Sequence, residues 1–185
     1  MSTDQRIPRV LMPLASGFED LEAVTIVDLL RRARVDVVTA GLQAGLIEGA
    51  RGFRCQPDTL LDAVLDQTFD MLVLPGGMPG AANLRDDARV QALLCRHAHA
   101  EKYVAAICAA PIALAQAGLL DGRDVTSYPG FLDRSTPVGA TYINAPVVRD
   151  GNILTSQGPG TAMDFALALI EALCGRAVRE RVETG

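Results

Sequence analysis

Residues 103–118 read YVAAICAAPIALAQAG, and they decide how the rest of the sequence is interpreted. The first five residues form an apolar run that is typical of a buried β-strand, and residues 109–117 have the composition of a helix. Pro111 suits the first turn of that helix, where its missing N–H leaves no hydrogen bond unmade. A buried strand that leads directly into a helix indicates an α/β protein.

The same alternation continues in both directions along the chain. Strands are predicted at 9–14, 35–40, 69–74 and 125–128, and helices at 18–33, 59–66, 87–100 and 161–173, the last ending at Gly175. Asp150-Gly151 is a hairpin signal between strands at 141–148 and 152–155. We therefore expect one domain over residues 1–185, with a flavodoxin-like, doubly wound, mostly parallel sheet and helices on both faces. Residues 42–55 should form a small antiparallel excursion, and residues 1–8 a flexible tail.

The composition favours a soluble globular protein. Of 185 residues, 49% are hydrophobic and 21% are charged, and the net charge of −5 argues against nucleic acids and anionic membranes as partners. The longest apolar stretch, 104–120, is interrupted by Pro111, Gln116 and Gly118, so no membrane span is expected. Residues 1–9 have no apolar core of a signal peptide, and the four cysteines show no paired spacing. These features predict a cytoplasmic protein.

Cys108 stands between the strand and the helix, at the edge of the sheet where ligands of such folds gather. The positive end of the helix dipole and its free amides would lower the pKa of the thiol and favour the thiolate. The context is that of a nucleophile elbow, with small alanines in place of the usual glycines. The alternative is a buried structural cysteine, the interpretation retained for Cys55, Cys95 and Cys174.

Pro75-Gly76-Gly77 ends another strand at the same edge of the sheet. The N–H groups of Gly77 and Ala109 could together form an oxyanion pocket, with Gly76 lining it, because glycines let the backbone approach closely. Taken alone, Pro-Gly-Gly is most often only a turn.

Glu22 is an acid on the apolar face of its predicted helix. It shares a stripe with Ile26, Leu29 and Ala33 at spacings of three and four. The stripe should face the sheet and bring Glu22 near Cys108. A carboxylate there would oppose a thiolate, so Glu22 should be protonated, able to donate a hydrogen bond and to transfer a proton. The alternative is a helix-start acid that reaches solvent.

The two histidines, His97 and His99, end a helix whose carboxyl terminus should lie at the opposite edge of the sheet from Cys108. Neither is placed to serve as its base. Cys95 and His99 are four residues apart, but a third ligand is lacking, so no metal site is predicted.

Two capping boxes are predicted, Ser16 with Glu19 and Thr161 with Asp164. The loop 156–161 could also be interpreted as an anion cradle. Because neither a P-loop lysine nor a Rossmann fingerprint accompanies it, the loop is expected to serve packing, and no cofactor is predicted.

Four blocks together resemble the ThiJ/PfpI superfamily, in its DJ-one/YajL-like branch. They are GFEDLEAV at 17–24, VLPGG at 73–77, AAICAAP at 105–111, and LTSQGPGT at 154–161 followed by Asp164-Phe165. The resemblance implies a flavodoxin-like fold and a homodimer without a cofactor. It also implies that Cys108 is the reactive cysteine, Glu22 the protonated glutamate and Gly77 the oxyanion donor.

One departure from the family's pattern concerns a histidine. Some members carry it near the cysteine, and the matching residue here is Tyr128, which could line the site but is a poor base. Other branches place a histidine directly after the cysteine, where this chain has Ala109. Peptidase activity is therefore not expected, and any turnover should be slow.

The resemblance implies cofactor-independent glyoxalase or deglycase activity on methylglyoxal and its adducts, in a stress-response role. The alternative is a non-enzymatic oxidative-stress sensor or redox-regulated chaperone, which would use the same cysteine and bind client proteins. A role in thiazole monophosphate biosynthesis, a name attached to such sequences, is not supported, because the sequence has no phosphate-binding fingerprint. A glutamine amidotransferase would need a histidine after the cysteine in the chain, and there is none.

Overall fold

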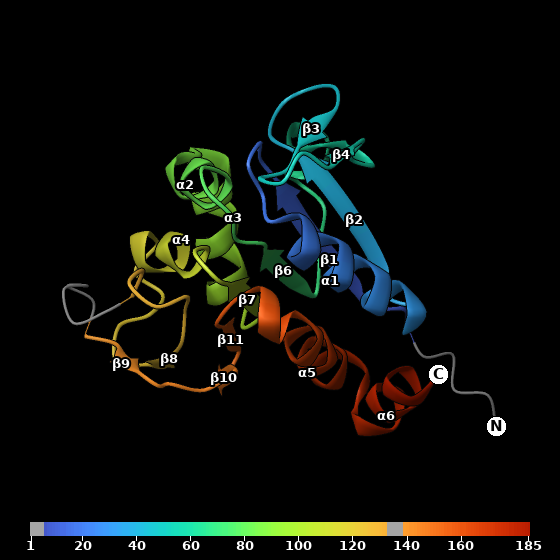
Figure 1. The fold of residues 1–185 in the computed structure, drawn as a ribbon, viewed down its shortest axis with the longest axis vertical. Helices are drawn as coiled ribbons and strands as arrows, with labels where there is room; N and C mark the ends of the chain where they lie inside the picture. The colour runs from blue at the N-terminus through green and yellow to red at the C-terminus, as the bar shows by residue number, and fades with distance from the viewer. Residues whose placement is uncertain (1–5, 133–138) are drawn as a thin grey trace.

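A seven-stranded sheet runs through the middle of the computed structural model, which describes residues 6–132 and 139–185 (Figure 1). The strand order is β10-β11-β7-β6-β1-β2-β5, and only β10 runs antiparallel to its neighbour. The strands are β1 (Arg9–Leu14), β2 (Asp36–Gly41), β5 (Thr59–Leu60), β6 (Met71–Leu74), β7 (Tyr103–Ile107), β10 (Val147–Asp150) and β11 (Ile153–Ser156). The predicted α/β, flavodoxin-like fold is confirmed.

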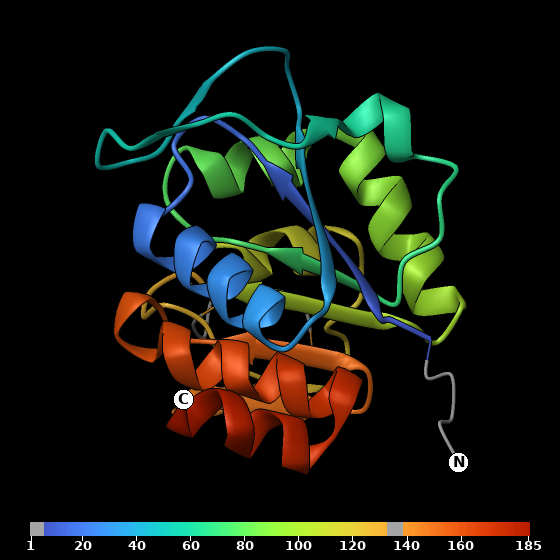
Figure 2. The same cartoon turned by 90° about the vertical axis from the view of Figure 1, so that its right-hand side faces the viewer.

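Helices cover both faces of this sheet (Figures 1 and 2). On one face α1 packs beside α5, which in turn packs against α6; on the other face lie α2, α3 and α4. The helices are α1 (Asp20–Arg32), α2 (Gly80–Asp86), α3 (Ala88–His99), α4 (Pro111–Gln116), α5 (Ala162–Cys174) and α6 (Arg176–Thr184). Burial on both faces explains why β6 and β7 read as unbroken apolar runs.

Residues 42–55 form the expected antiparallel excursion, in which β3 (Ile47–Glu48) pairs with β4 (Arg54–Cys55). The predicted hairpin is also present, since β10 and β11 pair on either side of Asp150-Gly151. Of the predicted tail 1–8, residues 1–5 lie outside the described part of the chain. Arg6 forms an ion pair with Asp70, and the Pro8 carbonyl accepts a hydrogen bond of 2.9 Å from Asp36 N.

Three predicted elements are wrong in extent. The helix expected at 59–66 is instead β5 followed by a short 3₁₀ helix, η1 (Leu61–Val64), because residues 59–60 pair with the edge of β2. The strand expected at 125–128 is reduced to β8 (Asp124–Val125), which pairs with β9 (Thr141–Tyr142) outside the main sheet. Beyond β8 the chain turns toward Cys108 instead of continuing as a strand. The strand expected at 141–148 is split into β9 and β10, with Pro146 between them.

Neither predicted capping box forms. The first helix starts at Asp20, two residues later than expected, because Glu19 N–H donates to the carbonyl of Gly76 (2.9 Å) and not to a cap. At the start of α5, Thr161 Oγ1 lies 2.7 Å from Ser156 Oγ and accepts from Gly158 N–H (3.1 Å), so it stabilises the preceding loop. Helices α2 and α6 were not anticipated.

Candidate functional site

Cys108 lies directly after β7 in a left-handed backbone conformation, with φ of 65°. A side chain in this region costs about 1 kcal/mol, which neighbouring structure must offset. Two backbone hydrogen bonds of 2.9 Å hold it there: Cys108 N–H donates to Ser156 O, and Tyr128 N–H donates to Cys108 O. Helix α4 then starts at Pro111, so the thiol stands at a sharp strand-to-helix turn and is only 9% exposed.

Glu22 is buried in the first turn of α1, on the side that faces the sheet. Its Oε2 accepts a hydrogen bond of 2.8 Å from the N–H of Gly76. Its Oε1 is also buried and has no nitrogen or oxygen partner among the described residues. The interpretation of Glu22 as a solvent-facing helix acid is therefore wrong, and the carboxyl is held without a cation beside it.

Gly76 is packed against both Cys108 and Glu22. A Cβ atom at this glycine would lie 2.5 Å from Cys108 Cβ and 2.8 Å from Glu22 Oε2, closer than such atoms approach in proteins. The two side chains thus converge on one glycine that is too tightly enclosed to carry a side chain. The structure brings together the cysteine and the glutamate that the sequence singled out.

The pKa values of the two groups are set mainly by burial. Burial raises the pKa of Glu22 to about 7, against the lowering effects of the Gly76 N–H and of Cys108. Burial and the charge of Glu22 raise the pKa of Cys108 to about 12, against the lowering effects of the N–H groups of Gly77 and Ala109. The expected thiolate at rest is therefore corrected: the amides act in the predicted direction, but desolvation outweighs them. Because the groups interact, the first proton is lost from the pair near neutral pH.

The backbone around Gly77 is fixed by close packing against the segment before α1. Gly77 has φ of 85°, and a Cβ there would lie 2.3 Å from the nitrogen of Glu19. Its N–H and that of Ala109 act on the Cys108 sulfur and favour negative charge there. These two amides are the donors expected for an oxyanion pocket.

Tyr128 and Gly158 border the thiol on its open side. The Tyr128 side chain is 48% exposed, and a Cβ added at Gly158 would lie 3.1 Å from Tyr128 Cδ2 and 3.8 Å from Cys108 Sγ. Gly158 was not among the predicted site residues, although it belongs to the glycine-rich loop 156–161. That loop reaches the site because β11 ends beside β7.

His97 lies at the opposite edge of the sheet, as expected. It is buried near the start of β7, and its carbonyl accepts from the N–H of Lys102, the residue before that strand. Within residues 6–132 and 139–185, no three His, Cys, Asp or Glu side chains are grouped as a metal site would require. In the same part of the chain, every helix is too short or too polar to cross a membrane.

Comparison with known proteins gives a consistent result. A sequence model of the DJ-1/PfpI family matches residues 8–172. The chain is 39% identical to the Drosophila melanogaster protein dj-1beta, covering 95% of this chain and 94% of that one. It is 34% identical to the Caenorhabditis elegans protein named glutathione-independent glyoxalase DJR-1.2, covering 92% and 90%. Two longer Arabidopsis thaliana relatives, DJ-1 homologs A and B, are spanned over only 45% and 39% of their length, each at 38% identity.

The fold comparison points the same way. The crystal structure of Drosophila melanogaster DJ-1beta superposes with a TM-score of 0.93 at 38% identity, covering 97% of both chains. The oxidized form of Toxoplasma gondii DJ-1 gives a TM-score of 0.90 at 38% identity over 96% of both chains. From the family match and these relatives, together with the sheet topology, the chain belongs to the DJ-1/PfpI family.

Proposed function

We propose that this protein is a cofactor-independent glyoxalase that converts methylglyoxal to lactate, and that it accepts adducts of methylglyoxal in a deglycase-type reaction. Cys108 is the nucleophile, Glu22 carries protons, and the N–H groups of Gly77 and Ala109 stabilise negative charge. The observation that carries the proposal is the convergence of Cys108 and Glu22 on Gly76, with the pKa of the carboxyl near neutral. The name of the Caenorhabditis elegans relative supports this choice of reaction.

The reaction can be written with Glu22 as the only proton carrier. The Cys108 sulfur bonds to the aldehyde carbon, the thiol proton reaches the aldehyde oxygen through Glu22, and a hemithioacetal forms. The Glu22 carboxylate then takes the proton from the former aldehyde carbon and returns it to the neighbouring carbon, while the hydroxyl proton of the hemithioacetal passes to the oxygen of that neighbouring carbon. The first carbon is thereby oxidised to a thioester and the second is reduced to an alcohol. Water cleaves the thioester to give lactate and the free thiol.

A carboxyl with a pKa near 7 suits this task because it is present in both protonation states at neutral pH. A resting thiol with a raised pKa needs such an acceptor, since its proton must leave as the sulfur attacks. No histidine base is required. The absence of a histidine at Tyr128 is consistent with slow turnover.

The test is lactate formation from methylglyoxal without glutathione, for the wild type and for Cys108→Ser. We expect the variant to lose at least 100-fold in kcat/KM while keeping its melting temperature. Cys55→Ser, Cys95→Ser and Cys174→Ser serve as controls and should keep activity within twofold. Equal activity in Cys108→Ser would refute the proposal.

A second candidate function is an oxidative-stress sensor or redox-regulated chaperone for client proteins, favoured by the similarity to an oxidized DJ-1 structure. Peroxide would oxidise Cys108 to a sulfinate, which would accept hydrogen bonds from Gly77, Ala109 and protonated Glu22. Intact-mass spectrometry after mild peroxide tests it. Two oxygens gained at Cys108, with protection of a client protein but no lactate formation, would favour the sensor. Even oxidation of all four cysteines would contradict the sensor.

We also propose that the protein is a homodimer and acts in the cytoplasm. Three exposed apolar side chains could contact a second copy of the chain. They are Leu21 and Val24 on α1, and Phe53 in the loop before β4. Val24 and Phe53 border the same cavity of about 330 Å³. Analytical ultracentrifugation should give the mass of two chains for the wild type. It should give the mass of one chain for the double variant that combines Val24→Asp and Phe53→Asp. A monomeric wild type would contradict the dimer.

A further inference from the structure

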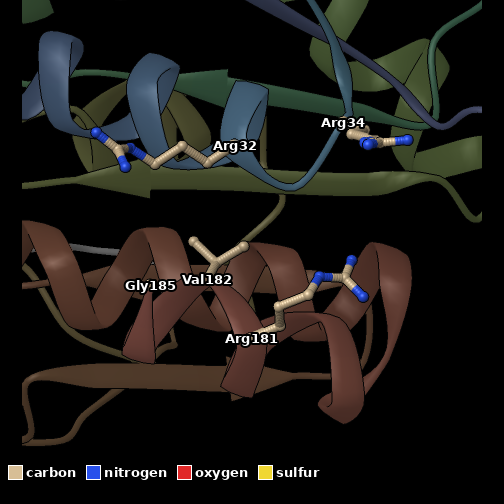
Figure 3. Close-up of a pocket in the computed structure, with 5 residues that line it drawn as sticks. All are labelled: Arg32, Arg34, Arg181, Val182 and Gly185. Carbon is tan, nitrogen blue, oxygen red and sulfur yellow. The ribbon is translucent and has the colours of Figure 1, made fainter.

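A second cleft lies at the other end of α1 from the site. Its volume is about 670 Å³, and it is lined by Arg32, Arg34, Arg181, Val182 and Gly185 (Figure 3). Glu22 and Arg32 stand ten residues apart on one helix, about 15 Å at the usual rise. The cleft is therefore separate from the Cys108 site, and its volume is within the range of small-molecule sites.

The arginines of the cleft differ in their partners. Arg32 Nε is paired with Asp28 (2.8 Å), on its own helix. The carboxylates of Glu180, Glu183 and Glu171 are paired with other arginines. Among the described residues, neither Arg34 nor Arg181 forms an ion pair. A chain of net charge −5 thus has two guanidinium groups without an ion-pair partner on one cleft, which Gly185 also lines.

The positions of the side chains fit a bound anion. Figure 3 shows the guanidinium group of Arg181 extending toward the end of the cleft where Arg34 lies, whereas that of Arg32 extends toward the other end. The Val182 side chain projects into the cleft, between the guanidinium groups of Arg32 and Arg181. Arginines in a last helical turn often only complement the helix dipole. That explanation does not cover Arg34, which follows the end of α1.

We propose that this cleft binds a small molecule carrying a phosphoryl group, held between Arg34 and Arg181 with its apolar part on Val182. Two guanidinium forks match the oxygens of a phosphoryl group in charge and in geometry. The source could be a phosphate ester or free phosphate, which share this chemistry. The experiment separates them.

Isothermal titration calorimetry measures the binding of phenyl phosphate and of inorganic phosphate. It is done on the wild type and on the double variant that combines Arg34→Gln and Arg181→Gln. We expect saturable binding of one phenyl phosphate per chain and at least tenfold weaker binding to the double variant. Arg176→Gln, an exposed arginine of α6 outside the cleft, is the matched control and should bind within twofold of the wild type. Tighter binding of phenyl phosphate than of phosphate assigns the site to esters, and equal binding assigns it to free phosphate.

The proposal is overturned if neither probe binds saturably, or if the double variant binds as the wild type does. Circular dichroism and melting temperature should be unchanged in all variants, because the altered side chains are exposed. Cys108→Ser should bind both probes as the wild type does. Failure of this proposal is thus distinguishable from failure of the glyoxalase proposal.

Discussion

Two carboxyl groups lie at opposite edges of the same sheet and have opposite properties. Asp70 precedes β6, and Glu22 contacts Gly76 just beyond the end of that strand. Asp70 accepts hydrogen bonds from Arg9 N–H (2.9 Å) and Lys102 Nζ (3.0 Å), and it is paired with Arg6. Burial alone would raise its pKa, but these donors lower it to about 2. Glu22 has one amide donor and no cation, and burial raises its pKa to about 7.

The surroundings of each carboxyl, and not its residue type, decide whether it is a structural carboxylate or a reactive group. Asp70 stays ionised and joins the start of β6 to the segments before β1 and β7. Glu22 gains and loses its proton close to neutral pH, which suits proton transfer beside Cys108. A structural carboxylate should therefore affect stability when it is changed, and a reactive one should affect activity.

The largest expected effect is the loss of activity in Glu22→Gln. The amide keeps the size of the side chain but cannot accept the thiol proton, so kcat/KM for methylglyoxal should fall at least 100-fold. Asp70→Asn is the matched variant at the other edge. It should keep activity within twofold per folded molecule and lose about 1–2 kcal/mol of unfolding free energy. If the two variants lose activity equally, the distinction between the carboxyls is wrong.

The second prediction concerns the glycine that Cys108 and Glu22 share. In Gly76→Ala the new methyl group would overlap Cys108 Cβ and Glu22 Oε2, so we expect a loss of about 3 kcal/mol in unfolding free energy together with most of the activity. Urea unfolding measures the first quantity and lactate formation the second.

Gly160→Ala is the control, because a Cβ there meets no atom within 4 Å. It lies in the same glycine-rich loop as Gly158 and should change stability by less than about 0.5 kcal/mol. A Gly76→Ala protein as stable and active as this control would show that the glycine is not enclosed as described.

The sequence predicted the site better than it predicted the local structure around it. Cys108 and Glu22 could be found because strand order and helical spacing fix which edge and which face they occupy. Gly158 was missed, because its place beside the thiol depends on the register between β11 and β7. The balance of pKa effects at Cys108 was also missed. A helix end is visible in a sequence, but the degree of burial that outweighs it depends on tertiary packing.

The fold was predicted at the level of sheet and layers, and less well at element ends. Both capping boxes failed for the same physical reason. Glu19 N–H is used by the Gly76 carbonyl, and Thr161 Oγ1 is used by Ser156 and Gly158. In the first case the competing hydrogen-bond partner is distant in the sequence, and in the second it lies in the loop that precedes the helix. In both cases the group that would have formed the cap is already hydrogen-bonded elsewhere.

The third prediction contrasts the two carboxyls through pH. The pKa of Glu22 is raised from 4.5 to about 7, so the folded protein keeps a proton that the unfolded chain releases in this window. The contribution of Glu22 to stability should therefore fall by about 3 kcal/mol as pH rises from 4.5 to 7, and buried His97, whose pKa is lowered, acts in the opposite direction. The pKa of Asp70 is lowered from 3.8 to about 2, so its contribution is present above pH 4 and is lost as pH falls toward 2.

Urea unfolding at steps of pH between 2 and 8 would measure both slopes. Glu22→Gln should remove the fall in stability between pH 4.5 and 7 that Glu22 causes and leave the acid limb unchanged. Asp70→Asn should reduce the slope of the acid limb only, to which Asp58 and Asp87 also contribute. An unchanged neutral slope in Glu22→Gln would mean that the glutamate is ionised throughout this range in the folded state.

The smallest expected effect tests whether a histidine beside the thiol would help. His97 is buried at the edge of the sheet away from Cys108, and Tyr128 borders the thiol. Tyr128→His would place a group that titrates near neutral pH at the reactive edge, and we expect kcat/KM to rise about threefold to tenfold. Tyr128→Phe should leave the rate within twofold, because the phenol is too weak a base to carry the thiol proton. A loss of more than tenfold in Tyr128→Phe would instead assign the hydroxyl a direct part in the reaction, and Glu22 would no longer be the sole proton carrier.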